Sequence, residues 1–264
     1  ELCGQSVSKS FVSNLIEKLD PVVKEWANRP LSLSYYPYLY VDAMYIKVRE
    51  GDRVVSKAVY IAMALSKQGK REIIGLKVSH QETFVAWQEF LQELKARGIQ
   101  SPKLIISDAH EGLKKAIAQE FLGTSWQRCT VHLKRNIFSH LPKKDTQEFR
   151  AQVIRIFRAT TIDDARQFLD DVQKGFEDDV KYHKALKVLE EGFEDAIQYL
   201  SFPLTIHRFI NSTNALERVN QEVRRRERVI RVFPNTNSAF RLIGAVLMDI
   251  DEQYKWKNPL NRKL

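Results

Sequence analysis

The sequence of 264 residues has few cysteines and no long apolar segment. Two cysteines, Cys3 and Cys129, are too few for a disulfide framework and are typical of a reducing cytoplasm. No run of about 18 apolar residues occurs, so we expect no transmembrane helix, and no signal peptide is recognisable. The chain begins at Glu1 without a methionine, which is consistent with a fragment or a processed chain. Internal repeats and low-complexity tracts are also lacking.

The charge balance is strongly basic, with 42 Lys and Arg against 33 Asp and Glu and a net charge of +9. A basic protein favours an acidic partner. Because no basic amphipathic membrane anchor stands out, we expect nucleic acid as the partner and no membrane association. Basic charge alone is also common among other enzymes, so it indicates a partner class and nothing finer.

Strand and helix patterns alternate between residues 38 and 141. The first three strands are separated by short turns, which predicts an antiparallel meander. Later strands alternate with amphipathic helices, which predicts an α/β fold with a mixed sheet flanked by helices. The expected strands are 39–48, 54–65, 72–78, 103–107 and 126–129, and the expected helices are 83–96, 111–121 and 131–141.

The remaining segments read as helical. Residues 145–199 contain no strand pattern and fit three helices, 146–159, 161–176 and 180–200. We therefore predict residues 1–30 as a helical remnant of an N-terminal DNA-binding region or a linker, with helices 8–19 and 21–26. Residues 31–136 form the first part of the core, 137–210 an all-α insertion, and 211–264 the completion of the core with a last helix at 238–254 and a basic tail.

An arginine-rich helix is expected between Ser212 and Pro234. Its apolar stripe comprises Leu216, Val219, Val223 and Ile230, and Ser212, Thr213 or Asn214 can serve as its N-cap. Glu217 and Arg224 share a neighbouring face two turns apart, which suits a metal-binding carboxylate beside a cation that holds a phosphate. The alternative is a solvated basic helix in which Glu217 pairs with an arginine.

Two further carboxylates occupy unusual places. Asp42 interrupts an apolar strand, where an unpaired charge is costly. Asp108 ends a buried strand, at the edge where α/β sheets place their sites. If the two strands are neighbours, the acids come side by side and call for a divalent cation. Two Mg²⁺ ions held by Asp42, Asp108 and Glu217 would support phosphodiester transfer. The alternatives are a hydrogen-bonded core acid for Asp42 and a helix N-cap for Asp108.

Five short runs carry a resemblance to a known family. The sequence resembles the Mutator-type bacterial insertion-sequence transposases, in the order of that family and over about residues 28–254. The runs are YLYVDA at 38–43, ISDAHEG at 106–112, CTVH at 129–132, NALERVN at 214–220 and VFPN at 232–235.

The resemblance implies a ribonuclease-H-like core with a DDE triad of Asp42, Asp108 and Glu217, interrupted by an all-α insertion before Glu217. It implies cleavage at the terminal inverted repeats of a transposon and joining of the 3′ end to target DNA. Arg224 matches the basic residue seven positions after the glutamate. We also expect Mn²⁺ to replace Mg²⁺, a homodimer that holds two ends, and a bacterial, nucleoid-associated location. The family's N-terminal DNA-binding region is mostly missing from this chain.

Other polar residues are candidates for supporting roles. Cys129 and His132 have the spacing of two zinc ligands, but no second pair lies nearby, and a small buried thiol is the alternative for Cys129. His110 would contact a phosphate or the nucleophile, or else lie on the surface, and Asn214 is a further auxiliary candidate. The expected DNA-binding residues are Arg224, Arg225, Arg228, Arg231, Lys134 and Arg135.

Two other functions remain consistent with the sequence. A ribonuclease-H-like nuclease would cut nucleic acid without a joining step, and a non-enzymatic DNA-binding module would need none of the three acids. The large helical insertion and the arginine helix favour the transposase over the nuclease. Asp42 in an apolar strand disfavours the binding module, because that module has no use for a costly buried charge.

Overall fold

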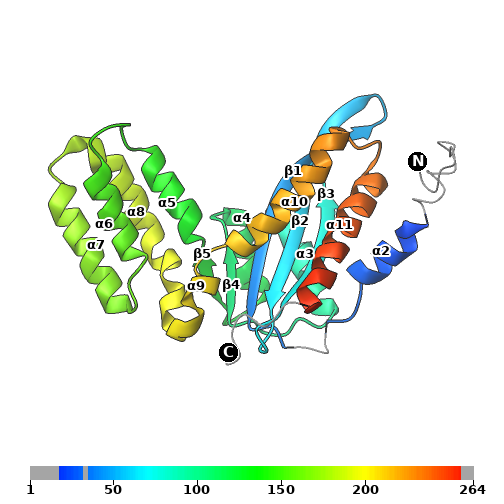
Figure 1. Ribbon diagram of the computed structural model, residues 1–264, viewed down its shortest axis with the longest axis horizontal. Coiled ribbons are helices and arrows are strands. Elements are labelled where there is room, and N and C mark those ends of the chain that lie inside the picture. The colour runs from blue at the N-terminus through cyan, green and yellow to red at the C-terminus, as the bar shows by residue number, and fades with distance from the viewer. Residues whose placement is uncertain (1–17, 32–34, 257–264) are drawn as a thin grey trace.

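The computed structural model describes residues 18–31 and 35–256, and its centre is a five-stranded mixed sheet (Figure 1). The strands β1 (Tyr38–Glu50), β2 (Arg53–Leu65) and β3 (Arg71–Ser79) are antiparallel, which confirms the predicted meander. The strands β4 (Leu104–Ser107) and β5 (Ser125–Arg128) continue the sheet in parallel with β1. The order is β3-β2-β1-β4-β5.

Helices cover both faces of the sheet because β1 and β2 alternate apolar side chains toward each face. Leu39 and Val41 belong to a core with α3 (Phe84–Ala96) and α4 (Glu111–Glu120). Tyr40 and Met44 belong to the opposite core with α10 (Asn214–Ile230) and α11 (Thr236–Trp256). The expected α/β fold, a mixed sheet with flanking helices, is therefore confirmed.

An all-helical segment lies beside the β5 edge of the sheet, at the left of Figure 1. It interrupts the α/β pattern where the sequence predicts an insertion, and α5 and α8 pack together beside β5. Gly192 allows this contact, because a Cβ there would lie 2.7 Å from Leu133 Cδ1. The elements are α5 (Thr130–Ser139), α6 (Gln147–Ile156), α7 (Ile162–Phe176), η1 (Val180–Tyr182), α8 (His183–Ala196), η2 (Gln198–Ser201), η3 (Leu204–Ile206) and α9 (His207–Ile210). The predicted boundary between residues 136 and 137 falls inside α5.

The buried carboxylate of Asp251 joins α11 and the first described helix to the sheet. It accepts hydrogen bonds from Trp26 Nε1 and Arg29, at the end of α2 (Leu19–Ala27), and from Ile73 N on β3. A buried charge needs such partners. The helices α2 and α11 lie side by side at the right of Figure 1, and this network is one of the contacts that joins them.

Several local expectations are corrected. The single helix predicted at 180–200 is a helix with a 3₁₀ turn at each end. Ile230, predicted on the buried stripe, is 38% exposed. Thr213 is the N-cap of α10 but makes no side-chain cap hydrogen bond. The predicted helix 8–19 and the tail after Trp256 lie almost wholly outside the described residues. Among those described, no helix is both long and apolar enough to span a bilayer.

Candidate functional site

The register of β1 and β4 brings two acids to one level of the sheet. The parallel pairing runs from Tyr38 opposite Leu104 to Tyr40 opposite Ile106 and then stops. Two residues further along each chain come Asp42 and Asp108. The prediction that these two strands are neighbours is therefore correct. The acids lie just beyond the end of β4, where β1 is no longer paired with it.

Asp42 is a partly buried carboxylate held by two donors. The backbone N–H of Ala43 donates to Oδ1 at 2.9 Å, and Asn220 Nδ2 donates to Oδ2 at 2.6 Å. Burial, followed by the negative charge of Asp108, raises the pKa of Asp42 to about 7. A cation at this place would offset both causes.

His132, in the first turn of α5, joins the other two acids. Its Nδ1 contacts Asp108 Oδ1, and its Nε2 lies 2.9 Å from Glu217 Oε1 on α10. The hydrogen bond to Asp108 is the main cause that raises the pKa of His132 to about 10. The imidazolium therefore places one positive charge between two carboxylates that come from different elements.

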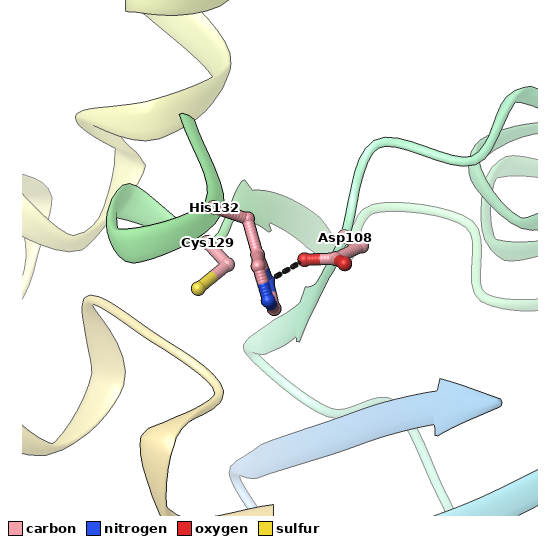
Figure 2. Close-up of side chains that lie close together, drawn as sticks. All are labelled: Asp108, Cys129 and His132. Carbon is pink, nitrogen blue, oxygen red and sulfur yellow. Dashed lines mark ion pairs between the residues drawn. The ribbon is translucent and has the colours of Figure 1, made fainter. Parts of the chain in front are cut away.

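Cys129 lies beside His132, on the side away from Asp108, and is fully buried (Figure 2). Thr213 donates to its Sγ from the backbone N at 3.4 Å and from Oγ1 at 3.3 Å. Burial raises its pKa, but the hydrogen bonds from His132 and Thr213 outweigh burial and leave the pKa of the thiol lowered. The alternative of a small buried thiol fits these contacts. The thiol ties the start of α5 to the start of α10.

Two sets of metal-ligand atoms overlap at this site. Asp108, Cys129 and His132 each offer one ligand atom within 4.8 Å of the others, a mixed set typical of zinc (Figure 2). The carboxylates of Asp42, Asp108 and Glu217 are the oxygen ligands that Mg²⁺ prefers. Asn220 Oδ1, beside Asp42, is buried and accepts no hydrogen bond from any residue that the structure describes. This unused oxygen favours a hard cation.

Other candidates occupy varied places. His110 is the N-cap of α4, and its Nδ1 accepts a hydrogen bond from Leu113 N at 3.2 Å. Lys134 is partly buried with its ammonium over the Phe157 ring, and burial lowers its pKa. Arg135 is exposed, as is Asn214. The arginines Arg224, Arg225, Arg228 and Arg231 are all exposed on or just after α10.

Sequence reasoning missed two contacts at the site. It did not predict that His132 bridges Asp108 and Glu217, because nothing in a Cys-x-x-His pair indicates acids from other elements. The hydrogen bond from Asn220 to Asp42 was not predicted either, although Asn220 ends the run at 214–220. Its spacing of three residues from Glu217 is the signal that places both side chains toward β1.

Comparison with known proteins gives consistent matches. The sequence model described as "Transposase, Mutator family" matches residues 1–257. The transposase for insertion sequence element IS256 in transposon Tn4001 of Staphylococcus aureus is 52% identical over 254 residues, covering 96% of this chain and 65% of the relative. The transposase for insertion sequence element ISRM5 of Rhizobium meliloti is 36% identical over 258 residues, covering 98% and 64%. The chain thus spans about 65% of the length of these curated relatives.

Two solved structures are similar at low sequence identity. The Drosophila P element transposase strand transfer complex has a TM-score of 0.47 at 11% identity, covering 97% of this chain and 87% of that one. The HTLV-2 integrase catalytic core domain in complex with magnesium has a TM-score of 0.26 at 13% identity, covering 60% and 88%.

Proposed function

Because this chain belongs to the Mutator family of transposases, we propose that it contains the catalytic centre of a DNA transposase. The proposed reaction is cleavage of phosphodiester bonds at transposon ends, followed by joining of the 3′-hydroxyl to target DNA. The proposed catalytic core consists of residues 31–136 and 211–264, with residues 137–210 as an insertion. The substrates are the terminal inverted repeats and the target DNA, in the nucleoid of a bacterial cytoplasm.

The observation that carries this proposal is the meeting of three acids from three separate elements. Asp42 comes from β1, Asp108 follows β4, and Glu217 lies on α10. His132 links Asp108 to Glu217, and Asn220 links α10 to Asp42. A protein that only binds DNA has no use for a carboxylate cluster that repels phosphate.

Asp42, Asp108 and Glu217 would hold two Mg²⁺ ions, with Mn²⁺ able to replace them. When bound, the ions supply activation of a water or a 3′-hydroxyl and stabilisation of the leaving oxygen. The residues of the chain orient this set. Asn220 fixes the Asp42 carboxylate, and His132 keeps Asp108 and Glu217 facing each other.

The arginines of α10 and the basic residues of α5 would hold DNA phosphates. Arg224 and Arg228 are exposed and form no ion pair within the described residues, whereas Arg225 pairs with Glu222 at 2.8 Å. Arg231, Lys134 and Arg135 add positive charge nearby. Joining two transposon ends requires both to be held together, so we propose a homodimer as the active assembly.

The test is a cleavage and strand-transfer assay with an oligonucleotide that carries a transposon end, in the presence of Mg²⁺ or Mn²⁺. We expect Asp42→Asn, Asp108→Asn and Glu217→Gln each to reduce cutting and joining to background while DNA binding persists. Glu222→Gln is the matched control, because it removes an exposed acid from the same helix. An acid variant that joined ends at the parent rate would remove that acid from the triad.

The same assay separates the alternative functions. Metal-dependent cutting without any joining would identify a nuclease. DNA binding with neither cutting nor joining, and with no effect of neutralising the acids, would identify a non-enzymatic binding module.

A further inference from the structure

A basic pocket of about 370 Å³ lies on the face of the sheet that α10 covers. We call it the arginine pocket. It is formed by the first residue of β3, by α9 and the loop after it, and by the first turn of α10. Its lining residues are Arg71, Arg208, Phe209, Ser212, Asn214, Ala215 and Arg218.

The three arginines of this pocket have no acidic partner. No carboxylate lines the pocket, and within the described ranges 18–31 and 35–256 no ion pair involves Arg71, Arg208 or Arg218. By contrast, the half-buried Arg29 is paired with Glu72 and Asp251, and Arg241 with Asp20. Three cations that converge without a counter-charge favour an anion from outside the chain.

Arg71 carries a buried donor that nothing in the described chain satisfies. Its Nε is shielded from solvent and donates no hydrogen bond to any described residue. An orphaned buried N–H is costly, and an acceptor from a ligand would remove that cost. This unsatisfied donor is independent of the lack of acidic partners for the three arginines.

The start of α10 adds a further attraction for an anion. The hydroxyl of the N-cap residue Thr213 donates to Cys129 Sγ and caps no backbone N–H of the helix. The positive end of the helix therefore faces Ser212, Asn214 and Ala215 at the pocket without a side-chain acceptor. The helix has 17 residues, so its dipole is fully developed.

The pocket and the acid cluster share the first turn of α10. Arg218 directly follows Glu217 on α10. Across the sheet, Arg71 on β3 pairs with Leu65 on β2, and Leu65 pairs with Tyr38 on β1. Tyr38 comes four residues before Asp42 on β1. Four residues of strand span about 13 Å. One DNA strand advances about 3.4 Å per nucleotide along the duplex axis, so the pocket lies within a few nucleotides of the acids.

We propose that the arginine pocket binds one backbone phosphate of the DNA strand, a few nucleotides from the bond that lies at Asp42, Asp108 and Glu217. This inference rests on the proposed function, and it assigns Arg71, Arg208 and Arg218 as substrate-positioning residues. The planar guanidinium groups donate in pairs to phosphate oxygens, so the pocket sets the register of the strand without reading its bases.

The first test is the salt dependence of DNA binding by Arg208→Gln, Arg218→Gln and the double variant, measured by fluorescence anisotropy. Both residues are exposed, so the substitutions spare the core. Each single variant should bind about 3- to 10-fold more weakly and lose about one unit of slope in the plot of log K against log salt. The double variant should also lose about one unit, because both side chains hold the same phosphate. Arg166→Gln on α7, whose cation pairs with Glu194, is the control and should leave the slope unchanged.

The second test replaces single phosphates of the oligonucleotide with neutral methylphosphonates. A methylphosphonate at one position should weaken DNA binding by the parent protein. The same replacement should not weaken DNA binding by Arg218→Gln any further. Unchanged slopes in both single variants would overturn the proposal. A reduced slope with no sensitive methylphosphonate position would overturn it too, because the arginines would then attract DNA by their general positive charge and would hold no single phosphate.

The outcomes separate this inference from the proposed function. Metal-dependent cutting with unchanged salt slopes would refute the pocket alone. A pocket-dependent slope and methylphosphonate position in a protein that never cuts DNA would refute the transposase proposal and leave the pocket standing. A parent chain that binds no DNA would refute both.

Discussion

At the residue scale, the site depends on side chains that neutralise one another. Asp42 lies within an apolar strand and faces Asp108. Burial and the negative charge of Asp108 together raise the pKa of Asp42 to about 7. His132 supplies the one positive charge between Asp108 and Glu217. The imidazolium therefore holds two like charges together, which is part of what a divalent cation would do here.

His132→Ala should destabilise the metal-free protein, because Asp108 and Glu217 would then face each other with no cation between them. The three groups are partly exposed, so we expect a loss of about 1–2 kcal/mol in the free energy of unfolding. Excess Mg²⁺ should reduce that loss. Urea denaturation with EDTA and with Mg²⁺ measures both.

His140→Ala is the control for this prediction, because His140 is exposed at the end of the same helix. Equal destabilisation by the two substitutions, or a loss at His132 that Mg²⁺ leaves unchanged, would contradict the charge-bridging role.

At the element scale, α10 combines three tasks on three faces. Leu216, Val219 and Val223 are buried against the sheet, Glu217 and Asn220 face the acid cluster, and the arginines are exposed. A helix with an apolar stripe this narrow depends on tertiary packing for its stability. Packing of this stripe against the sheet therefore sets the position of α10, and the position of α10 brings Glu217 to the other two acids.

The arginines of α10 should differ in their contribution to DNA binding. Arg224→Ala should reduce the salt slope of DNA binding by about one unit, since its cation forms no ion pair in the described part of the chain. Arg225→Ala should reduce the slope by less, because Glu222 already neutralises that cation. Fluorescence anisotropy over a salt series compares them. Equal slopes for parent and Arg224→Ala would argue against a phosphate contact there.

The end of α10 carries backbone strain at Arg231. Its φ is 63° and its ψ is −49°, and Val232 N donates to Ile230 O at 2.8 Å, which defines a γ-turn with positive φ. Glycine adopts this conformation without a Cβ clash. Arg231→Gly should therefore stabilise the protein by about 1 kcal/mol and raise Tm by about 2–4 °C.

Arg231→Ala separates strain from the loss of the side chain, because alanine keeps the Cβ. It should give no comparable increase in Tm. A thermal melt in which both variants behave alike would show that the γ-turn stores no strain that glycine relieves.

At the scale of the whole molecule, the titration of the site affects the stability of the entire fold. The pKa of Asp42 is about 7 in the folded protein against an ordinary 3.8. Between these two pH values the folded state binds more protons than the unfolded state, so stability falls as pH rises from about 4 to about 7. His132 has a pKa of about 10 against an ordinary 6.5, so its contribution is fully present below 6.5 and is lost as pH rises toward 10.

The free energy of unfolding of the metal-free protein should therefore fall as pH rises from about 4 to about 10, by at most about 1.4 kcal/mol per pH unit for each group. Urea denaturation in EDTA at several pH values measures this slope. In the plot of unfolding free energy against pH, Asp42→Asn should reduce the slope below pH 7, and His132→Ala should reduce the slope above pH 7. Stability that rose with pH in the parent would contradict both assignments.

The sequence by itself determined the elements and the candidate acids. Thr83, Thr161 and the glycines at 51 and 69 mark helix starts and turns through local backbone chemistry, and the structure places α3, α7 and the meander accordingly. Asp42 was recognisable because a charge within an apolar strand is costly. Periodicity also separated the sheet from the helical insertion.

Only the tertiary structure decided which side chains meet. The register of β1 and β4 set Asp42 level with Asp108, the packing of α5 and α10 placed His132 between Asp108 and Glu217, and the loop before α10 directed Thr213 toward Cys129 in place of its cap. The arginine pocket joins Arg71 to residues more than a hundred positions later. Local propensity and spacing act over a few residues, whereas these contacts depend on how distant elements pack, and no pattern within a short segment encodes them.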